Sequence, residues 1–434
     1  MSDLSQPPWR EGPGLIPRYV VQPTLQFMRV EAASGIVLVV AAVAALIWAN
    51  GFGDSYEDFW HTEIVLDFAL LTLREPLEGW VNDALMVIFF FVVGLEIKRE
   101  AVHGELRDRR QAMMPIMAAL GGMIVPAMFF MAFNAGGEGA SGWGIPVATD
   151  IAFALGVLSL LGPRVPIQLK IFLLTVAVTD DIGGILIIAF FYTDHLVVAW
   201  LGGGAVTIGV ILAMQRGGVR SVLPYVPVGA VLWLCIFESG VEATIGGVIL
   251  GLMTPAKAMI DRERFGTTAT DLIGEFRSAM GRGPLEDPHT RADEDPHAGL
   301  HPGEMADRVM RHDLADSAIG RISEVARETQ SPLQRVEHAV GPWSAFVVVP
   351  IFALANSGII LTGGSISDAL QSDIAWGVAV GLVLGKFVGV LVFSYLTVRL
   401  GISRLPPGVR WAHIGGVGLL AGIGFTVAIF IATL

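Results

Sequence analysis

The stretch LLTVAVTDDIGGILIIAFF, residues 173–191, places two adjacent carboxylates, Asp180 and Asp181, inside an otherwise apolar run. The run is long enough to cross a bilayer as a helix, which takes about 20 residues. An ionised side chain at mid-membrane costs at least about 2.5–3.5 kcal/mol, so such acids usually face a cavity and serve transport. The pair therefore predicts a functional centre inside a transmembrane helix; the alternative is an internal salt bridge or a pair of helix-end acids.

The composition of the whole chain indicates an all-α polytopic membrane protein. Of the 434 residues, 53% are hydrophobic and 16% are charged, against about 25% charged in an average soluble domain. The single cysteine, Cys235, excludes an internal disulfide and a cysteine-built metal cluster, so no cofactor is expected. Much of the net charge of −12 lies in one hydrophilic insertion, so it indicates no nucleic-acid partner. Residues 1–26 have no signal-peptide pattern.

Eleven apolar segments are candidate membrane spans, although some are short or interrupted by glycine, so their boundaries vary by a few residues. They are approximately residues 30–50, 82–97, 112–133, 144–161, 168–192, 197–214, 222–237, 241–255, 343–361, 375–398 and 412–433.

Basic residues give an independent test of the orientation of these segments, because Lys and Arg accumulate in short loops on the cytoplasmic side. The loops after the second, fourth, sixth and tenth segments carry Lys98, Arg99, Arg107, Arg109, Arg110, Arg164, Lys170, Arg216, Arg220, Arg399, Arg404 and Arg410. In the short loops between the other segments, the only Lys or Arg residue is Arg74. The pattern predicts a cytoplasmic N-terminus and, with eleven spans, an external C-terminus.

The charge pattern also defines the domain organisation. Residues 1–29 are predicted to be a cytoplasmic tail, 30–255 spans 1–8, 256–334 a hydrophilic cytoplasmic insertion, and 335–434 spans 9–11. Within the insertion, residues 281–304 have a composition typical of disorder, whereas residues 305–328 have helical spacing. The insertion contains His289, His297, His301 and His312. These histidines lack metal-ligand spacing, so a linker is favoured over a metal site.

Further ionisable residues lie within the apolar segments. Asp150 follows Pro146 in the fourth segment, Lys386 lies in the middle of the tenth, and Asp83 and Glu96 lie near the two ends of the second. Neighbouring residues on a helix point about 100° apart, so the two central carboxylates have different directions. We expect Asp181 to face a water-filled funnel and Asp180 to pair with Lys386.

The paired acids favour an exchanger of cations and protons. Burial disfavours the charged form of a carboxylate, which can then hold either a proton or a small hard cation. Two segments are also interrupted, by Pro146 and by Gly422 with Gly424. Interrupted helices in two halves of a transporter point to an ion site at the midplane, and Asp150 there would neutralise a positive helix end. The alternative for the first interruption is a simple proline kink.

Seven stretches of this chain resemble the NhaA-type bacterial sodium/proton antiporters, in the order in which that family has them. They are NDALMVIFFFVVGLEIKRE (82–100), PVATDIAFALGVLSLLGPRVPIQLKIFLL (146–174), TDDIGGILIIAFFYT (179–193), SGVEATIGGVILG (239–251), LANSG (354–358), LGKFVG (384–389) and GIGFTVAIFIA (422–432). The resemblance implies inverted repeats with discontinuous helices 4 and 11. It also implies electrogenic exchange of cytoplasmic Na+ or Li+ for external H+, for sodium and pH homeostasis, in a bacterial inner membrane.

The resemblance also assigns roles to single residues. The ion and proton site corresponds to Asp180, Asp181, Asp150, Thr149 and Lys386. The cytoplasmic funnel and its pH-responsive entrance correspond to Asp83, Glu96, Lys98, Arg99, Glu100, Glu242, Glu337 and His338. In the family an external hairpin at HTEIVLDFALL, residues 61–71, joins two protomers. A homodimer in the lipid bilayer is therefore expected; a surface loop in a monomer is the alternative.

The chain departs from the family pattern in three ways. Glu242 stands where well-studied relatives have a histidine, and Gly341 stands where a second histidine would follow His338, so a different pH response is expected. Shorter relatives lack the insertion. The sequence ends at Leu434, at the end of the eleventh segment, which leaves the family's twelfth helix without a counterpart.

Two other classes of function are alternatives to antiport. An intramembrane aspartyl protease needs one aspartate on each of two facing helices, in a GxGD context, whereas Asp180 and Asp181 share one helix and neither follows a GxG sequence. A sodium-coupled organic anion symporter of similar fold has less use for two titrating acids at its centre. The sequence therefore favours a secondary antiporter over an enzyme.

Overall fold

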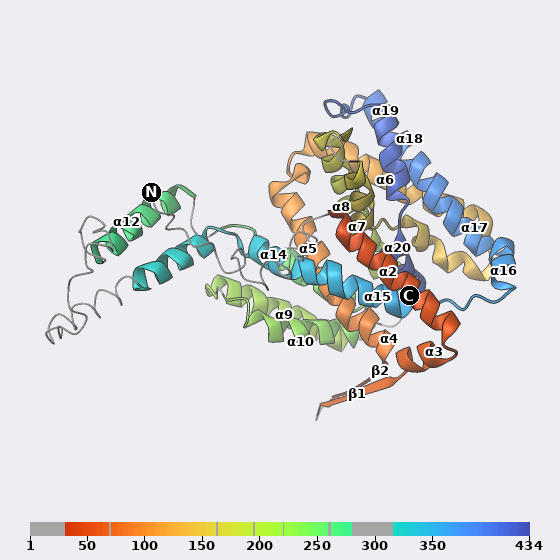
Figure 1. The fold of residues 1–434 in the computed structure, drawn as a ribbon, viewed down its shortest axis with the longest axis horizontal. Helices are drawn as coiled ribbons and strands as arrows, with labels where there is room; N and C mark the ends of the chain where they lie inside the picture. The colour runs from red at the N-terminus through yellow and green to blue at the C-terminus, as the bar shows by residue number, and fades with distance from the viewer. Residues whose placement is uncertain are drawn as a thin grey trace, which may run out of the picture. The chain divides into compact units, whose positions relative to one another are not determined.

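The computed structural model describes residues 31–68, 71–161, 164–193, 196–219, 221–258, 262–279 and 316–434. This part of the chain is mainly helical and has one two-stranded sheet (Figure 1). Up to residue 160 its elements are α2 (Glu31–Gly51), α3 (Ser55–Trp60), β1 (Glu63–Phe68), β2 (Leu71–Pro76), α4 (Leu77–Trp80), η3 (Val81–Leu85), α5 (Met86–His103), η4 (Glu105–Arg107), α6 (Arg109–Asn134), η5 (Glu138–Val147) and α7 (Ile151–Leu160).

The remaining elements fall into two groups. Among the described residues, three segments are π-helical: η3, given above, and η8 and η9, given below. The first group is α8 (Ile167–Phe191), α9 (Val198–Arg216), α10 (Tyr225–Phe237), α11 (Thr244–Met253), α12 (Arg262–Ala279) and a helix at 316–328. The second is α14 (Pro332–Trp343), η8 (Ser344–Val348), α15 (Val349–Asn356), α16 (Ser365–Gln371), α17 (Asp373–Val380), η9 (Gly381–Gly385), α18 (Lys386–Arg399), α19 (Trp411–Ala421) and α20 (Phe425–Thr433).

The chain divides into two compact units, one of residues 1–254 and 337–434 and one of residues 255–336. The smaller unit has limits close to those of the predicted insertion. It holds α12 and the helix at 316–328, with an ion pair between Arg321 and Glu275. The stretch 281–304, the four histidines of the insertion and the N-terminal tail lie outside the described residues. Of the predicted helix at 305–328, only residues 316–328 are described, and these are helical.

The larger unit is that of a multi-pass membrane protein. Seven described helices are long and apolar enough to cross a membrane, and α19 with α20 forms an eighth span that is bent by 40°. The predicted spans at 222–237 and 241–255 coincide with the short apolar helices α10 and α11. The predicted span at 144–161 coincides with η5 and α7. The number of eleven spans stays a prediction.

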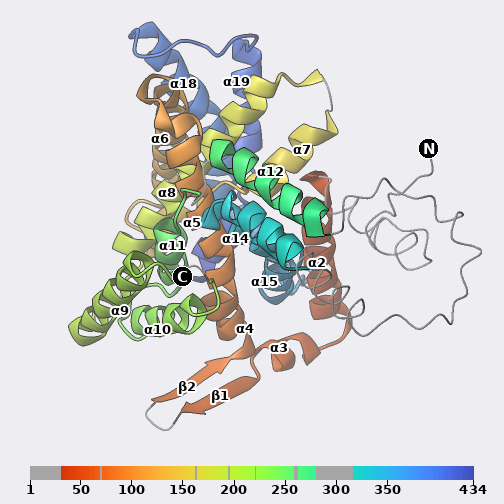
Figure 2. The ribbon, with the colours of Figure 1, turned by 90° about the vertical axis from the view of Figure 1, so that its left-hand side faces the viewer.

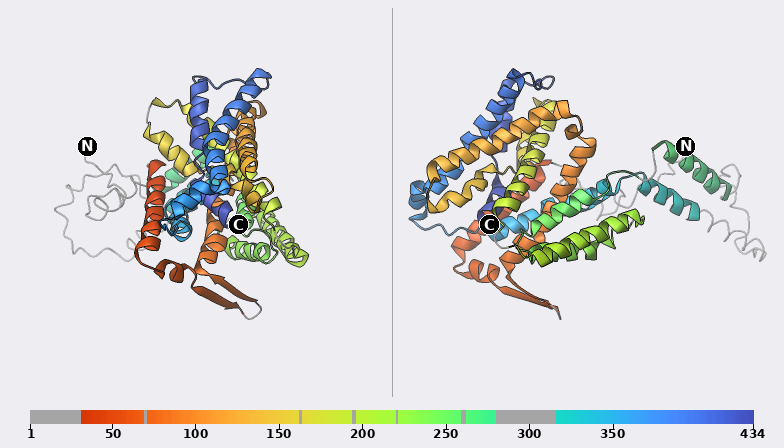
Figure 3. Two further views of the ribbon diagram at one scale, coloured as in Figure 1. Left: turned by 90° about the vertical axis from the view of Figure 1, so that its right-hand side faces the viewer. Right: turned by 180° about the vertical axis from the view of Figure 1, so that it is seen from behind.

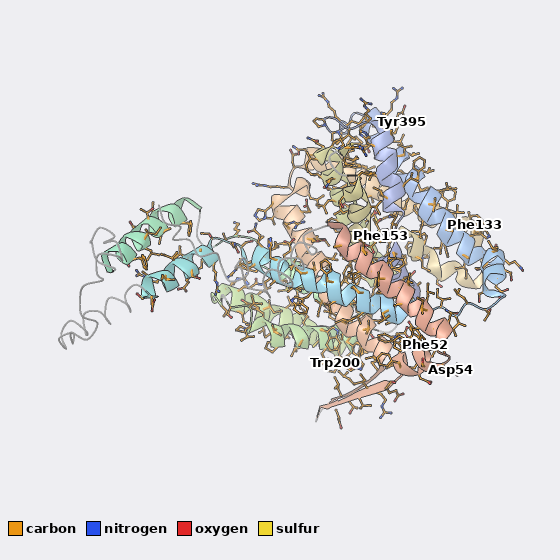
Figure 4. All side chains as sticks on the ribbon, in the orientation of Figure 1. Phe52, Asp54, Phe133, Phe153, Trp200 and Tyr395 are labelled. Carbon is orange, nitrogen blue, oxygen red and sulfur yellow. The ribbon has the colours of Figure 1, made fainter. Side chains whose placement is uncertain are left out.

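Strands β1 and β2 form the hairpin that the family resemblance implied between the first two spans. They are antiparallel, and Glu63 pairs with Pro76 at the open end. The hairpin lies next to α3 and α4 and extends beyond the ends of the long helices (Figures 1 and 2). Phe52 and Asp54 lie at this end of the unit, and Tyr395 of α18 lies at the opposite end (Figure 4).

The ninth predicted span, at 343–361, was wrong at its C-terminal end, because the helix stops at Asn356 and residues 357–362 have no regular structure. Side chains from the last turn of α2 and from α3 provide the missing hydrogen bonds. The Tyr56 hydroxyl lies 2.8 Å and 2.6 Å from the carbonyls of Leu354 and Ala355 and accepts from Gly358 N at 3.1 Å. Asn50 bonds Ile359 O and Leu361 N. Such partners stabilise an irregular backbone because they satisfy the polar groups that a helix would have paired.

Replacing Tyr56 with phenylalanine is expected to destabilise the protein by about 1–3 kcal/mol, because it leaves buried backbone groups without their partner. Burial raises the pKa of Tyr56 to about 12 from 10.0, so the protonated phenol is favoured in the fold. The stabilisation is therefore fully present below pH 10 and is lost as the pH rises through 12. Melting temperatures of the two proteins should differ at pH 8 and converge toward pH 12; equal values at pH 8 would contradict the anchoring role.

Two interrupted segments cross each other near the middle of the larger unit. The first runs from η5 through the extended residues 148–150 into α7, and the second from α19 through residues 422–424 into α20. Asp150 N donates to Ile423 O at 2.7 Å, so the two interruptions are joined directly. A Cβ atom on Gly424 would lie 2.8 Å from Ala148 O, which explains why glycine is needed at this crossing.

Helices α6 and α18 lie side by side and position the lysine of the tenth span (Figures 1 and 3). Their backbones touch at Gly121 and Gly389, where a Cβ on Gly389 would lie 2.1 Å from Gly121 O. Small residues allow such close approach between membrane helices. The approach brings the first residue of α18, Lys386, next to α8.

Candidate functional site

The centre of the site is a buried ion pair between Lys386 of α18 and Asp180 of α8. Lys386 Nζ lies 2.7 Å from Asp180 Oδ2, and the two residues are 0% and 1% exposed. The pairing expected from the sequence is therefore present. Removing a single partner from a buried pair costs about 3–5 kcal/mol, so each charge depends on the other.

Thr149, in the first interruption, completes this pair. Its hydroxyl lies 2.8 Å from Asp180 Oδ2 and 2.9 Å from Ala421 O, and it accepts from Lys386 Nζ at 2.9 Å. A hydroxyl has one hydrogen, so it donates to one of the two oxygens at a time. Thr149 thus connects the ion pair to the end of α19.

The position of Lys386 follows from the helix before it. The π-helical segment η9, Gly381–Gly385, ends immediately before the lysine. Such segments insert an extra residue into a turn and often occur at functional sites. Gly385 packs against Pro126 of α6, where a Cβ would lie 2.7 Å from Pro126 Cα. The close approach directs the lysine side chain along α6 toward Asp180.

Two carboxylate groups of α8 keep oxygens without hydrogen-bond partners among the described residues. Asp180 Oδ1 is buried and has none. Asp181 is only half-buried, and no hydrogen bond within the described ranges involves its side chain. Asp181 lies within electrostatic range of Glu96, Asp180 and Asp150, all acidic, and of Lys386. These oxygens are the ones available to a proton or a cation.

Asp150 lies beside the ion pair but has a different environment. Its Oδ1 accepts from Phe153 N at 3.0 Å and caps α7. Its Oδ2 accepts from the Thr426 hydroxyl at 2.6 Å and from Thr426 N at 3.4 Å, in the first turn of α20. Phe153 also packs against Phe425, with ring centroids 6.4 Å apart. One carboxylate therefore serves the N-terminal ends of two half-helices, where negative charge is stabilising.

The structure brings together part of the predicted entrance. Arg99 of α5 forms an ion pair with Glu337 of α14 and lies 3.9 Å from Glu100 Oε1. Glu96, one turn earlier on α5, interacts electrostatically with all three. His338 follows Glu337 and is exposed. These residues lie near the end of the span at 77–103 that is farther from the hairpin.

Asp83 and Glu242 do not join that cluster. Asp83 lies in η3, near the start of the same span, about 24 Å along the helix from Arg99 at 1.5 Å per residue. It interacts electrostatically with Glu242 and Glu75, and its backbone carbonyl accepts from Trp233 Nε1 at 2.7 Å. Glu242 accepts from the Thr244 hydroxyl at 3.2 Å. The predicted funnel residues thus form two groups, at opposite ends of one span.

Sequence reasoning missed Thr426 and the carbonyl of Ala421. Both lie in or beside the second interruption, GIGFT, which had been singled out for its glycines. The available signal was a hydroxyl residue two positions after an interrupting glycine, in the first turn of a half-helix.

A buried ion pair with neighbouring acids, at the crossing of two interrupted segments of a multi-pass membrane protein, defines a secondary transporter of small ions and not an enzyme. A sequence model of the family described as Na+/H+ antiporter 1 matches residues 25–434. The chain therefore belongs to this family.

Similar proteins from distant bacteria agree with this membership. The Na(+)/H(+) antiporter NhaA of Oleidesulfovibrio alaskensis is 45% identical over 426 residues, which cover 97% of this chain and 89% of that protein. The NhaA of Rhodopirellula baltica is 42% identical over 412 residues, covering 95% and 86%. The NhaA 2 of Sorangium cellulosum is 44% identical over 418 residues, covering 96% and 84%.

Proposed function

We propose that this protein exchanges cytoplasmic Na+ or Li+ for external protons. The observation that carries the proposal is the buried Asp180–Lys386 pair with Asp181 beside it. Asp181 is half-buried, and its side chain takes part in no hydrogen bond within the described ranges. Carboxylate oxygens suit small hard cations, and the same oxygens take protons. A cation and a proton that compete for one site, open alternately to each side, are exchanged.

The roles within the site follow from the contacts. Asp181 is the direct ligand of the transported cation, because its oxygens have no protein donor within the described ranges. Asp180 is the carboxylate coupled to Lys386, and the Thr149 hydroxyl positions both side chains by hydrogen bonds. Asp150 contributes by neutralising the half-helix ends. Two titrating carboxylates can release more than one proton per cation bound, which makes the exchange electrogenic.

The finer architecture is part of the same proposal. The segments at 138–160 and 411–433 are the discontinuous fourth and eleventh of eleven spans, in an inverted-repeat fold. The N-terminus and the insertion at 256–334 lie in the cytoplasm, and the protein resides in a bacterial inner membrane. Basic residues at Arg99, Arg107 and Arg399 support this orientation.

The two groups of funnel residues at the ends of the span at 77–103 sense pH and conduct ions to and from the central site. Arg99, Glu100, Glu337 and His338, with Glu96, form the cytoplasmic entrance. Asp83 and Glu242 face the hairpin end, where they draw protons and cations on the external side. The hairpin joins two protomers into a homodimer, which agrees with the exposed Ile64, Val65 and Leu66 on β1.

Collapse of a preset pH gradient in vesicles tests the exchange. Purified protein is reconstituted, and Na+, Li+ or K+ is added in separate assays while a pH dye reports the interior. Na+ and Li+ should collapse the gradient, and the rate should change when a membrane potential is imposed with K+ and valinomycin. A gradient that survives Na+ and Li+ in protein vesicles as in empty ones would refute antiport, and insensitivity to the potential would refute electrogenic exchange.

A further inference from the structure

The second interrupted segment supplies a residue whose contacts reach the ion pair without touching it. We infer that Thr426 is a positioning residue for cation exchange, which acts through Asp150 on Thr149 and the Asp180–Lys386 pair. The inference rests on the proposed exchange activity.

The contact between Thr426 and Asp150 is short and buried. The hydroxyl lies 2.6 Å from Asp150 Oδ2, and the two residues are 2% and 4% exposed. The backbone N–H of Thr426 reaches the same oxygen only at 3.4 Å. The hydroxyl is therefore the main donor to Oδ2, while Phe153 N occupies Oδ1. With both oxygens engaged, Asp150 links the two half-helices and is withheld from the transported cation.

The link continues along the backbone to the ion pair. Asp150 N donates to Ile423 O at 2.7 Å, so residue 150 is fastened to the second segment on its backbone and on its side chain. The adjoining residue, Thr149, contacts Asp180 Oδ2, Lys386 Nζ and Ala421 O within 2.9 Å. A shift of Asp150 moves the hydroxyl that holds Asp180 and Lys386 in place.

Two substitutions separate the hydroxyl from the rest of the side chain. Thr426→Val keeps the size and the branched Cβ but removes the donor, whereas Thr426→Ser keeps the donor. We expect Thr426→Val to raise the KM for Na+ about tenfold, equivalent to about 1.4 kcal/mol, with a smaller change in maximal rate, and Thr426→Ser to stay within about twofold of the wild type. The matched control is Thr433→Val, because Thr433 of the same helix is exposed and, among the described residues, its hydroxyl bonds only Phe430 O, at 2.8 Å.

A double-mutant cycle tests whether the effect passes through Asp150. Residues that act through one contact give non-additive effects, so Thr426→Val should raise KM much less in an Asp150→Asn background than in the wild type. The rise in melting temperature with added Na+ or Li+, measured in detergent, follows cation binding without transport. It should shrink in Thr426→Val and be restored in Thr426→Ser.

The outcomes separate this inference from the proposed function. Wild-type vesicles without Na+-driven exchange would refute the function, and the cation-dependent melting shift would then still compare the valine and serine variants. The inference is overturned if Thr426→Val has wild-type KM and melting shift, if Thr426→Ser is impaired as strongly as Thr426→Val, or if the cycle with Asp150→Asn is additive.

Discussion

Replacing Asp181 with asparagine is expected to reduce Na+-driven proton exchange to the level of empty vesicles while the protein stays folded. Asparagine has nearly the same size but neither binds a proton nor carries the charge that a cation needs. The Asp181 side chain takes part in no hydrogen bond within the described ranges, so folding loses no contact. Its acidic neighbours Glu96, Asp180 and Asp150 are relieved of a like charge. The melting temperature should therefore be equal to or higher than that of the wild type.

The combination of lost exchange and retained stability is the informative result. A transport site often sacrifices stability for function, and removing its repelling charge returns that stability. The measurements are pH-gradient collapse on adding Na+ or Li+, and thermal unfolding of the same preparation in detergent. Asp368→Asn is the matched control, since Asp368 is an exposed acid in α16, and it should leave both measurements unchanged.

Asp180→Asn should also abolish exchange, but with a different effect on folding. Here the variant leaves the fully buried Lys386 without its counter-charge, so the melting temperature should fall. Normal exchange in both the Asp180 and Asp181 variants would show that the central assignment is wrong. A loss of stability in Asp181→Asn as large as in Asp180→Asn would contradict the division of roles between them.

The centre of the site could be predicted from the sequence because intramembrane charges are rare and costly. Asp180, Asp181 and Lys386 are conspicuous in apolar runs, and a buried cation needs an anion, which made the Asp180–Lys386 pair the natural expectation. The hairpin between the first two spans was expected from the family resemblance, and strands β1 and β2 are present there.

The hydroxyl contacts at the site could not be derived from the residues alone, because a threonine in a membrane helix normally bonds its own helix. Thr149 was expected at the site only from the family resemblance, and Thr426 was missed. Thr175 donates to Ile171 O and Thr179 to Thr175 O, each four residues back. Thr149 and Thr426 lie where a helix is interrupted, so their hydroxyls bond acidic side chains instead. The residue type alone therefore does not show whether a threonine bonds its own helix or an acidic side chain.

The C-terminal end of the ninth span also could not be predicted from the sequence. Ile359, Ile360 and Leu361 are as apolar as the helix before them, and their exposed positions depend on Tyr56 and Asn50, about 300 residues earlier. The separation of Asp83 from Glu337 has a similar cause. Both residues match one functional region in the resemblance, and only the lengths and directions of the two packed spans place them at different ends.

Replacing Lys386 with alanine is expected to lower the free energy of unfolding by about 3–5 kcal/mol. The rate of exchange should be affected less strongly than the stability and should not be abolished. Asp180 would keep only the Thr149 hydroxyl as a partner for Oδ2, and its Oδ1 already has no partner among the described residues. Alanine also leaves a cavity, so Lys386→Met, which retains the length without the charge, isolates the electrostatic part. Asp181 keeps its carboxylate in either variant, and a residual exchange should persist.

The decisive comparison adds Asp180→Asn to Lys386→Met. If the cost arises from an uncompensated carboxylate, removing that charge should restore much of the lost melting temperature, so the double variant should melt above Lys386→Met although it has two substitutions. Lys98→Met, at a partly exposed lysine of α5, serves as the control and should melt like the wild type. Unchanged melting of Lys386→Met together with complete loss of exchange would instead make the lysine a participant in transport, because its ammonium would then matter to the moving ions and not to the carboxylate it touches in the fold.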